Sequence, residues 1–293
     1  MNDPGAEFRL DLRRVRRAFD RAAAGYETGA VLQRTVESHS LARLDLIRIA
    51  PRTIVDLGCG PGVAGRALLR RYRGAQVIGL DIAPAMLHAA RRRRRWFSAQ
   101  RFVCADGLAM PLPADSVDLV FSNLTVQWCA DPAALFAEVW RVLRPGGLFL
   151  FTSLGPDTLR ELRAAWRQAD AAVHVHAFID MHDLGDALAR SGFESPVLDV
   201  EQFCLTYPDV RALARDLKFI GAGNAAAGRG RGLGGRARWQ AMAAAYEPFR
   251  ADDRLPATFE VVHAHAWKPL HIRRSEPDGA QALHFHPRRV KQA

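Results

Sequence analysis

Between residues 53 and 152 the chain alternates short apolar segments with longer amphipathic ones, and this alternation restricts its fold more than any other feature. The apolar segments have the length of strands, and the segments between them carry apolar residues at helical spacing. Strands that alternate with helices in this way form βαβ units, so the sequence predicts a largely parallel sheet. Strands are expected at 53–57, 76–80, 101–104, 117–122 and 148–152, and helices at 64–73, 84–94, 133–143 and 157–171.

The flanking regions are predicted to add helices, one loop and a tail. Residues 8–50 read as helical with breaks at 22–25 and at Gly29, and 144–147 reads as a helix stop followed by a turn. Helices are also expected at 182–190, 209–220 and 236–246, and strands at 196–200 and 258–267. We therefore expect a helical cap over 1–50, a main domain over 51–267 with a helical, Gly- and Arg-rich lid at about 205–255, and a basic disordered tail over 268–293.

Charge and cysteine content limit the partners and the compartment. The formal net charge is +10, which favours acidic partners, although an arginine-rich composition also suits a genome rich in G and C. The four cysteines (Cys59, Cys104, Cys129 and Cys204) are far apart, which favours a reducing, cytoplasmic compartment. No apolar run is long enough to span a membrane. We expect a monomer that acts away from membranes and nucleic acid.

The segment DLGCGPG at 56–62 follows a predicted strand and precedes a predicted helix. Its glycines allow a ligand to approach the backbone at the strand end. A literal G-x-G-x-x-G begins at Gly60, but it is late relative to the strand, and Asp56 would repel a pyrophosphate. A ligand with an ammonium group and no phosphate, such as S-adenosylmethionine, tolerates this carboxylate.

Polar residues also follow the next three predicted strands. Asp81 ends the second strand, where a carboxylate can accept hydrogen bonds from both ribose hydroxyls. Asp106 follows the third strand and can accept from an adenine amino group, with Ile82 and Leu108 on either side of the ring. Asn123 follows the fourth strand. Each aspartate alone could merely cap a turn or a helix, but the ordered set favours a ligand site.

These motifs resemble the class I S-adenosylmethionine-dependent methyltransferases, together with Asp118 and the segment LRPGG at 143–147. The resemblance implies an α/β fold: a Rossmann-like seven-stranded sheet with helices on both faces, an N-terminal helical extension and a helical insertion before the last strand. It implies that S-adenosylmethionine is the cofactor. No metal is expected, because the three His-x-His pairs (174/176, 263/265 and 284/286) have no Cys or acidic partner at ligand spacing. The implied contacts are Asp56, Gly58 and Gly60 at the methionine part, Asp81 at the ribose and Asp106 at the adenine. Ile82, Gly107 and Asn123 complete the expected cofactor-binding residues.

A second resemblance covers about residues 15–267. The segments AFDRAAAGY at 18–26, LQR at 32–34, SNLTVQWC at 122–129 and DLKFIGA at 216–222 resemble the BioC family of malonyl-acyl carrier protein methyltransferases. This implies methylation of the free malonyl carboxyl on an acyl carrier protein, in biotin synthesis. GPDTLREL at 155–162, DLG at 183–185 and LPAT at 255–258 also resemble a methyltransferase-fold arginine hydroxylase that assembles mitochondrial complex I. A methyltransferase for another small carboxylic acid is a further alternative.

The resemblance makes Tyr26, Gln127 and Trp128 the candidate catalytic residues, as groups that position the substrate. A carboxylate is already ionised at neutral pH, so the reaction needs no general base. Trp128 could instead be a core residue, and Gln127 could cap a helix. The arginines at 91–95 could dock an acidic protein or complement a helix end. We expect the Arg- and Gly-rich segment 229–238 to be the lid that docks the carrier.

Overall fold

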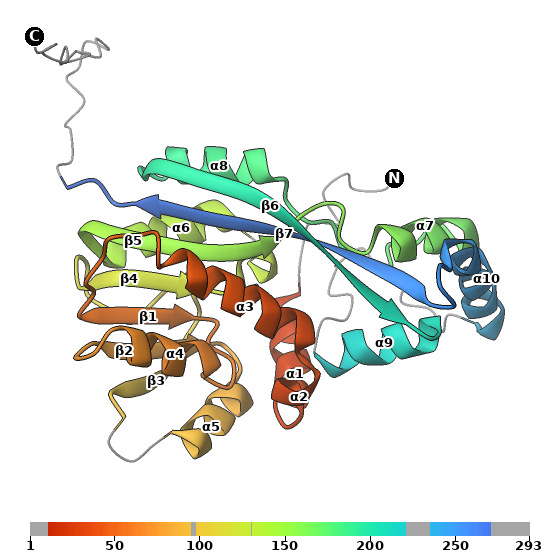
Figure 1. Cartoon of the computed structure of the whole chain (residues 1–293), viewed down its shortest axis with the longest axis horizontal. Helices are drawn as coiled ribbons and strands as arrows, with labels where there is room; N and C mark the ends of the chain where they lie inside the picture. Colours follow the sequence, from red (N-terminus) through yellow and green to blue (C-terminus); the bar gives the residue numbers. More distant parts are fainter. Residues whose placement is uncertain (1–10, 95–97, 130, 221–234, 271–293) are drawn as a thin grey trace, which may run out of the picture.

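The structure is a computed structural model that describes residues 11–94, 98–129, 131–220 and 235–270. Its centre is a seven-stranded sheet with the order β3-β2-β1-β4-β5-β7-β6 (Figure 1). Strands β1 to β5 run parallel to one another, whereas β7 is antiparallel to both β5 and β6. This confirms the Rossmann-like sheet. The strands are β1 Thr53–Leu57, β2 Gln76–Asp81, β3 Gln100–Cys104, β4 Val117–Ser122, β5 Leu143–Leu154, β6 Glu194–Tyr207 and β7 Leu255–Trp267.

The helices begin and end close to the predicted positions within the described residues. The break at 22–25 separates the first two helices, and Gly29 ends the second. The helices are α1 Leu12–Ala22, α2 Tyr26–Gly29, α3 Val31–Arg43, α4 Val63–Arg71, α5 Pro84–Arg93, α6 Pro132–Val142, α7 Arg160–Ala169, α8 Met181–Arg190, α9 Val210–Phe219 and α10 Arg236–Tyr246, with 3-10 turns η1 Val126–Trp128 and η2 Glu247–Phe249.

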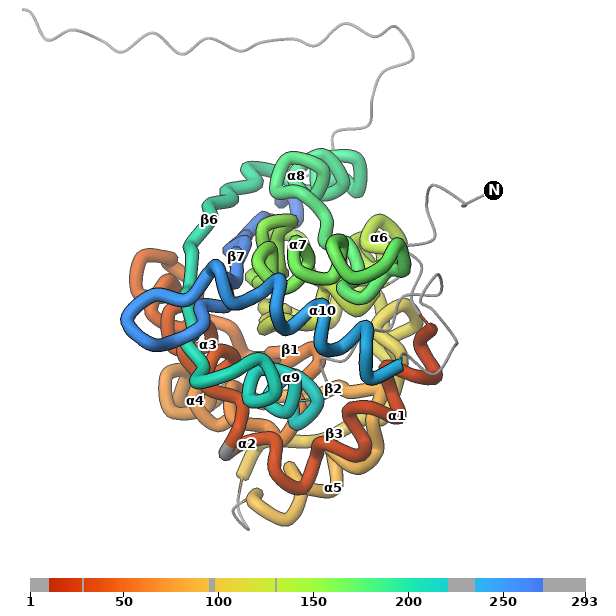
Figure 2. The backbone as a smooth tube through the Cα atoms, turned by 90° about the vertical axis from the view of Figure 1, so that its right-hand side faces the viewer, coloured from red at the N-terminus to blue at the C-terminus, as the bar shows by residue number. Residues whose placement is uncertain are grey.

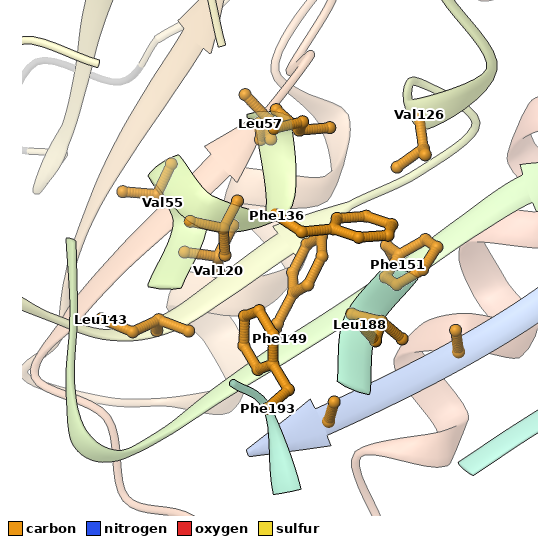
Figure 3. Packing of buried hydrophobic residues seen from close by; sticks show 14 of the residues in the cluster. Val55, Leu57, Val120, Val126, Phe136, Leu143, Phe149, Phe151, Leu188 and Phe193 are labelled. Carbon is orange, nitrogen blue, oxygen red and sulfur yellow. The ribbon is translucent and has the colours of Figure 1, made fainter. Parts of the chain in front are cut away.

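Helices cover both faces of the sheet, because its central strands are apolar on both sides. On one face Phe149 and Phe151 of β5 stack with ring centroids 4.6 Å apart and pack against Phe136 of α6 (Figure 3). On the other face Leu148 and Leu150 belong to a cluster with residues of α4 and the end of α3. Alternate residues of one strand thus enter two cores, as a buried parallel strand requires. The rigid sheet fixes the strand ends where the site lies.

A third apolar cluster lies where β6 and β7 extend past the rest of the sheet. It joins α3 to α7, α9 and α10, and it includes Leu32, Leu162, Leu213 and Met242. Figure 2 shows α7, α9 and α10 on the same side of the molecule as α1 and α2. The helical segment between β6 and β7 therefore packs beside the N-terminal helices.

Some predicted bounds were wrong. The strand predicted at 196–200 is part of the much longer β6, whose alternation is hidden by acidic residues that pair with α3: Asp199 with Arg43 and Glu201 with His39. The turn predicted at 144–147 lies within β5, where Gly146 has a φ of 76°. Helix α7 starts three residues late because Leu159 is left-handed, with a φ of 57°.

The start of the predicted tail is also ordered. Lys268 is buried, and its ammonium donates to Asp115 and to the backbone oxygens of Trp140 and Leu143. The remainder of the predicted tail, from residue 271, lies outside the described residues, as do residues 221–234 of the predicted loop and Arg95 of the arginine run.

Candidate functional site

The carboxyl ends of β1, β2 and β4 and the segment after β3 open into one cavity, as expected for parallel strands. All the predicted site residues line it except Asp56 and Gln127. We call it the cofactor cavity. Its walls include Leu12, Val15, Phe19, Tyr26, Gly58, Gly60, Asp81, Ile82, Met86, Asp106, Gly107, Leu108, Asn123, Leu124, Thr125 and Trp128.

The loop after β1 requires glycine and is held by Asp81. Gly58 has a φ of 71°, and a Cβ atom there would overlap the side chain of Thr125. Gly60 has a φ of 50°, and its N–H donates to Asp81 Oδ2 at 2.9 Å. The other carboxylate oxygen of Asp81 accepts from the N–H of Ala83 at 2.8 Å. Asp81 thus organises the glycine loop and still has lone pairs available to a ligand.

The opposite wall combines one further aspartate with apolar side chains. Asp106 accepts from the N–H of Leu108 at 3.0 Å, so it closes its own turn, as the alternative interpretation predicted. It nevertheless lines the cavity together with Ile82 and Leu108, which are half-buried. Asp106 therefore both closes a turn and lines the cavity. The apolar side chains of Ile82 and Leu108 can contact an aromatic base.

A polar recess adjoins the cofactor cavity and shares Tyr26, Gly58, Gly60 and Asn123 with it. Asp56 lies here, buried, with Oδ2 accepting from the N–H of Gly65 at 3.0 Å. Burial, followed by the charge of Glu37, raises the pKa of Asp56 to about 8. Burial also raises the pKa of Glu37 to about 7. A cationic ligand would favour the ionised form of both carboxyl groups.

Sequence reasoning did not identify Gln33 and Glu37, which α3 contributes to this recess. The Gln33 side-chain oxygen is buried and has no hydrogen-bond partner in the described part of the chain, while its backbone oxygen accepts from Asn123 Nδ2. An unpaired buried acceptor beside two carboxyl groups suits an ammonium group. The segment LQR at 32–34 was the available signal, although it gave no indication of position.

The N-terminal helices close the cavity on the side away from the sheet. Phe19 of α1 contacts Tyr26 and Trp128 edge to face, with ring centroids at 6.3 and 5.4 Å. Asp20 accepts from the N–H of Ala85 at 3.0 Å, which ties α1 to the start of α5. Burial and the charge of Asp81 raise the pKa of Tyr26 above its usual range, so its hydroxyl stays protonated.

Gln127 is the candidate catalytic residue that the cavities do not include. It lines neither the cofactor cavity nor the polar recess, and its amide nitrogen donates to the Leu124 backbone oxygen at 2.8 Å. Its role in catalysis stays a prediction. Trp128, by contrast, is half-buried and forms part of the cavity wall.

The described ranges contain neither a metal-binding cluster nor a membrane-spanning helix. No group of three or more His, Cys, Asp or Glu side chains there is arranged to hold a metal ion. None of the helices in the described residues is long and apolar enough to cross a membrane.

Comparison with known proteins identifies the family. A methyltransferase domain family matches residues 55–151. A malonyl-(acyl-carrier protein) O-methyltransferase of Methylovorus is 55% identical to this chain over 285 residues, which cover 95% of this chain and 96% of the relative. The chain belongs to the malonyl-(acyl-carrier protein) O-methyltransferase family. This decides between the two resemblances in favour of the methyltransferase.

Solved structures agree with the fold of this family. The structural alignment with YcgJ from Bacillus covers 79% of this chain and 99% of the YcgJ chain, with a TM-score of 0.57 at 16% identity. A Haemonchus contortus phosphoethanolamine N-methyltransferase, solved with S-adenosylhomocysteine, covers 79% of this chain and 52% of its own, at 20% identity and a TM-score of 0.50. The cofactor of the present protein, as a member of its methyltransferase family, is S-adenosylmethionine, which supplies an electrophilic methyl group when bound. The glycine loop at Gly58 and the unpaired acceptor of Gln33 fit its methionine part.

Proposed function

We propose that this protein transfers the methyl group of S-adenosylmethionine to the free carboxylate of a malonyl thioester on an acyl carrier protein, as a step towards biotin. The observation that carries the proposal is the 55% identity with a relative of that name over nearly the whole chain. The cofactor cavity supports it, because the predicted strand-end residues converge there beside Tyr26 and Trp128.

The reaction requires positioning more than proton transfer. A carboxylate oxygen forms a bond to the methyl carbon while the bond from carbon to sulfur breaks, and no proton moves. Two polar side chains in the wall of the cofactor cavity agree with this. Tyr26 stays protonated, and burial raises the pKa of Cys129 to about 12, so neither is a base or a nucleophile at neutral pH. Holding the reacting atoms in line and excluding water then account for the rate.

We propose Asp56, Gly58, Gly60, Asp81, Ile82, Asp106, Gly107 and Asn123 as the cofactor-binding residues, and Gln33 and Glu37 as additions to them. Tyr26 and Trp128 are proposed to hold the acyl end of the substrate. The division of the chain stays part of the proposal: 1–50 as a cap over the cofactor, 51–267 as the catalytic domain, and about 205–255 as a lid.

The carrier protein is the proposed partner, and acidic carriers suit a chain with a net charge of +10. The arginines that end α5 are better explained as part of the fold. Arg91 and Arg94 donate to the backbone oxygens of Phe102 and Gln100, and Arg93 pairs with Glu27 at 3.0 Å. We therefore place the docking surface elsewhere on the molecule.

Incubation of the pure protein with malonyl-carrier protein and methyl-labelled S-adenosylmethionine tests the function. We expect label on the carrier and a mass gain of one methylene unit, removed by mild alkali as for an ester. Acetyl-carrier protein, which lacks the free carboxylate, is the matched control and should remain unlabelled. Equal labelling of both carriers, or of neither, would contradict the proposal.

A further inference from the structure

A second cavity of about 190 Å³ begins at Trp128, which also lines the cofactor cavity. Its walls come from α7, the segment before α8, α9, α10 and β7. It therefore extends from the point at which methyl transfer is proposed towards the helical segment between β6 and β7. We call it the acyl channel.

The lining of the acyl channel is mainly aromatic and aliphatic. Trp166 stacks on His174 at 3.6 Å between ring centroids, and His174 contacts Asp170 at 2.7 Å, which fixes this wall. Asp170 also pairs with Arg238 at 3.7 Å, so the same network joins α7 to α10. The wall is thus rigid and apolar, as the binding site of a narrow uncharged ligand would be.

His176 is the exception within this lining. Its side chain is 4% exposed and lies between Trp128 and Phe178, with ring centroids at 5.2 and 4.5 Å. Its Nε2 atom is enclosed and has no partner in the described ranges. Burial, followed by the charge of Arg163, lowers the pKa of His176 to about 4, so the ring is neutral at pH 7 and has one N–H to donate. A ligand oxygen beside Trp128 would satisfy it.

The channel also has one cationic residue in its described lining, Lys218 of α9. Its side chain is exposed, and none of the ion pairs within the described residues involves it. Arg211 and Arg215 are exposed on the same helix. An apolar channel with a cation at its outer end suits a long uncharged arm that ends in a phosphate.

We infer that the acyl channel binds the phosphopantetheine arm of the carrier protein, with Lys218 on its phosphate and His176 on the thioester carbonyl beside Trp128. This order places the malonyl carboxylate on the cofactor side of Trp128. The inference rests on the proposed function and adds the route by which the substrate enters. In this arrangement the basic surface of α9 meets the acidic carrier.

Truncated substrates test the Lys218 contact without the carrier. Lys218→Ala should raise KM about tenfold for malonyl-phosphopantetheine and leave KM for malonyl-pantetheine, which lacks the phosphate, unchanged. Arg215→Ala is the matched control, because it removes the same charge from the same helix but does not line the channel. It should leave KM for both small substrates unchanged.

The interior of the channel is tested by Ala214 and His176. Ala214→Phe places a ring in the channel and should raise KM for both thioesters at least about tenfold. His176→Phe keeps the ring contacts with Trp128 and should lower kcat/KM about tenfold, with partial rescue in His176→Asn. Calorimetry should give wild-type affinity for S-adenosylmethionine in all these variants, which shows that they fold.

The outcomes separate the two proposals. If the wild-type protein methylates malonyl thioesters but Lys218→Ala affects both substrates equally and Ala214→Phe has a normal KM, the channel assignment is wrong and the proposed function stands. If the wild-type protein methylates no malonyl thioester, the proposed function fails and the channel assignment with it.

Discussion

Replacing Asp81 by alanine should weaken cofactor binding roughly a hundredfold or more. In the free protein its two carboxylate oxygens accept from the N–H groups of Gly60 and Ala83 at 2.9 and 2.8 Å, so it is already aligned to receive ribose hydroxyls. Two hydrogen bonds to a charged acceptor contribute about 1.5–3 kcal/mol each, and every 1.4 kcal/mol is about tenfold in Kd. Titration calorimetry with S-adenosylhomocysteine measures the change directly.

Asp118 provides the matched control, because it lies near the amino end of β4, away from the cofactor cavity. Its carboxylate also accepts two backbone N–H groups, those of Arg52 and Thr53 at 2.9 and 2.8 Å, and it pairs with Arg144. Asp118→Ala should therefore lower the free energy of unfolding while leaving Kd for the cofactor unchanged. Wild-type affinity in Asp81→Ala, or an equal loss in both variants, would refute the assignment of Asp81 to the ribose.

The remaining predictions concern the recess, the loop, the cap and the carrier. Cofactor affinity should rise between about pH 6 and 9, because pKa values of about 7 for Glu37 and 8 for Asp56 mean that both lose protons there and a cation favours their ionised forms. Calorimetry in two buffers should show proton release on binding, reduced in Glu37→Gln; equal heats in both buffers would contradict this. Gly58→Ala should abolish binding by calorimetry, since its Cβ would overlap Thr125. Trp128→Ala should lower kcat more than Tyr26→Phe, because Trp128 is a wall of both cavities. KM for the carrier should rise steeply with ionic strength, and a flat dependence would exclude electrostatic docking.

The cofactor cavity could be predicted from the sequence because it depends on local order along the chain. Parallel strands bring their carboxyl ends to one edge, so Asp81, Asp106 and Asn123 had to lie near each other once the strands were recognised. The glycine at Gly58 was likewise recognisable from its place directly after a strand. Neither inference needed knowledge of how distant segments pack.

The acyl channel and the polar recess could not be predicted in the same way. The channel brings Trp128, His176, Ala214 and Trp239 together. Their approach depends on the length of the edge strand β6, whose alternation is concealed by its acidic residues. Gln33 enters the recess because α3 packs over the strand ends, which is a property of tertiary packing. The helical spacing of α3 fixes its buried face but not its location.

The pH dependence of kcat at saturating cofactor and saturating malonyl-carrier protein tests the central claim most directly. Saturation removes the contribution of Glu37 and Asp56 to binding and leaves the methyl transfer step. A carboxylate nucleophile is ionised throughout, so we predict a flat profile between about pH 6 and 9. A steep rise in kcat across that range, abolished by one substitution in the cavity, would show that the nucleophile has to lose a proton and would contradict methylation of a carboxylate.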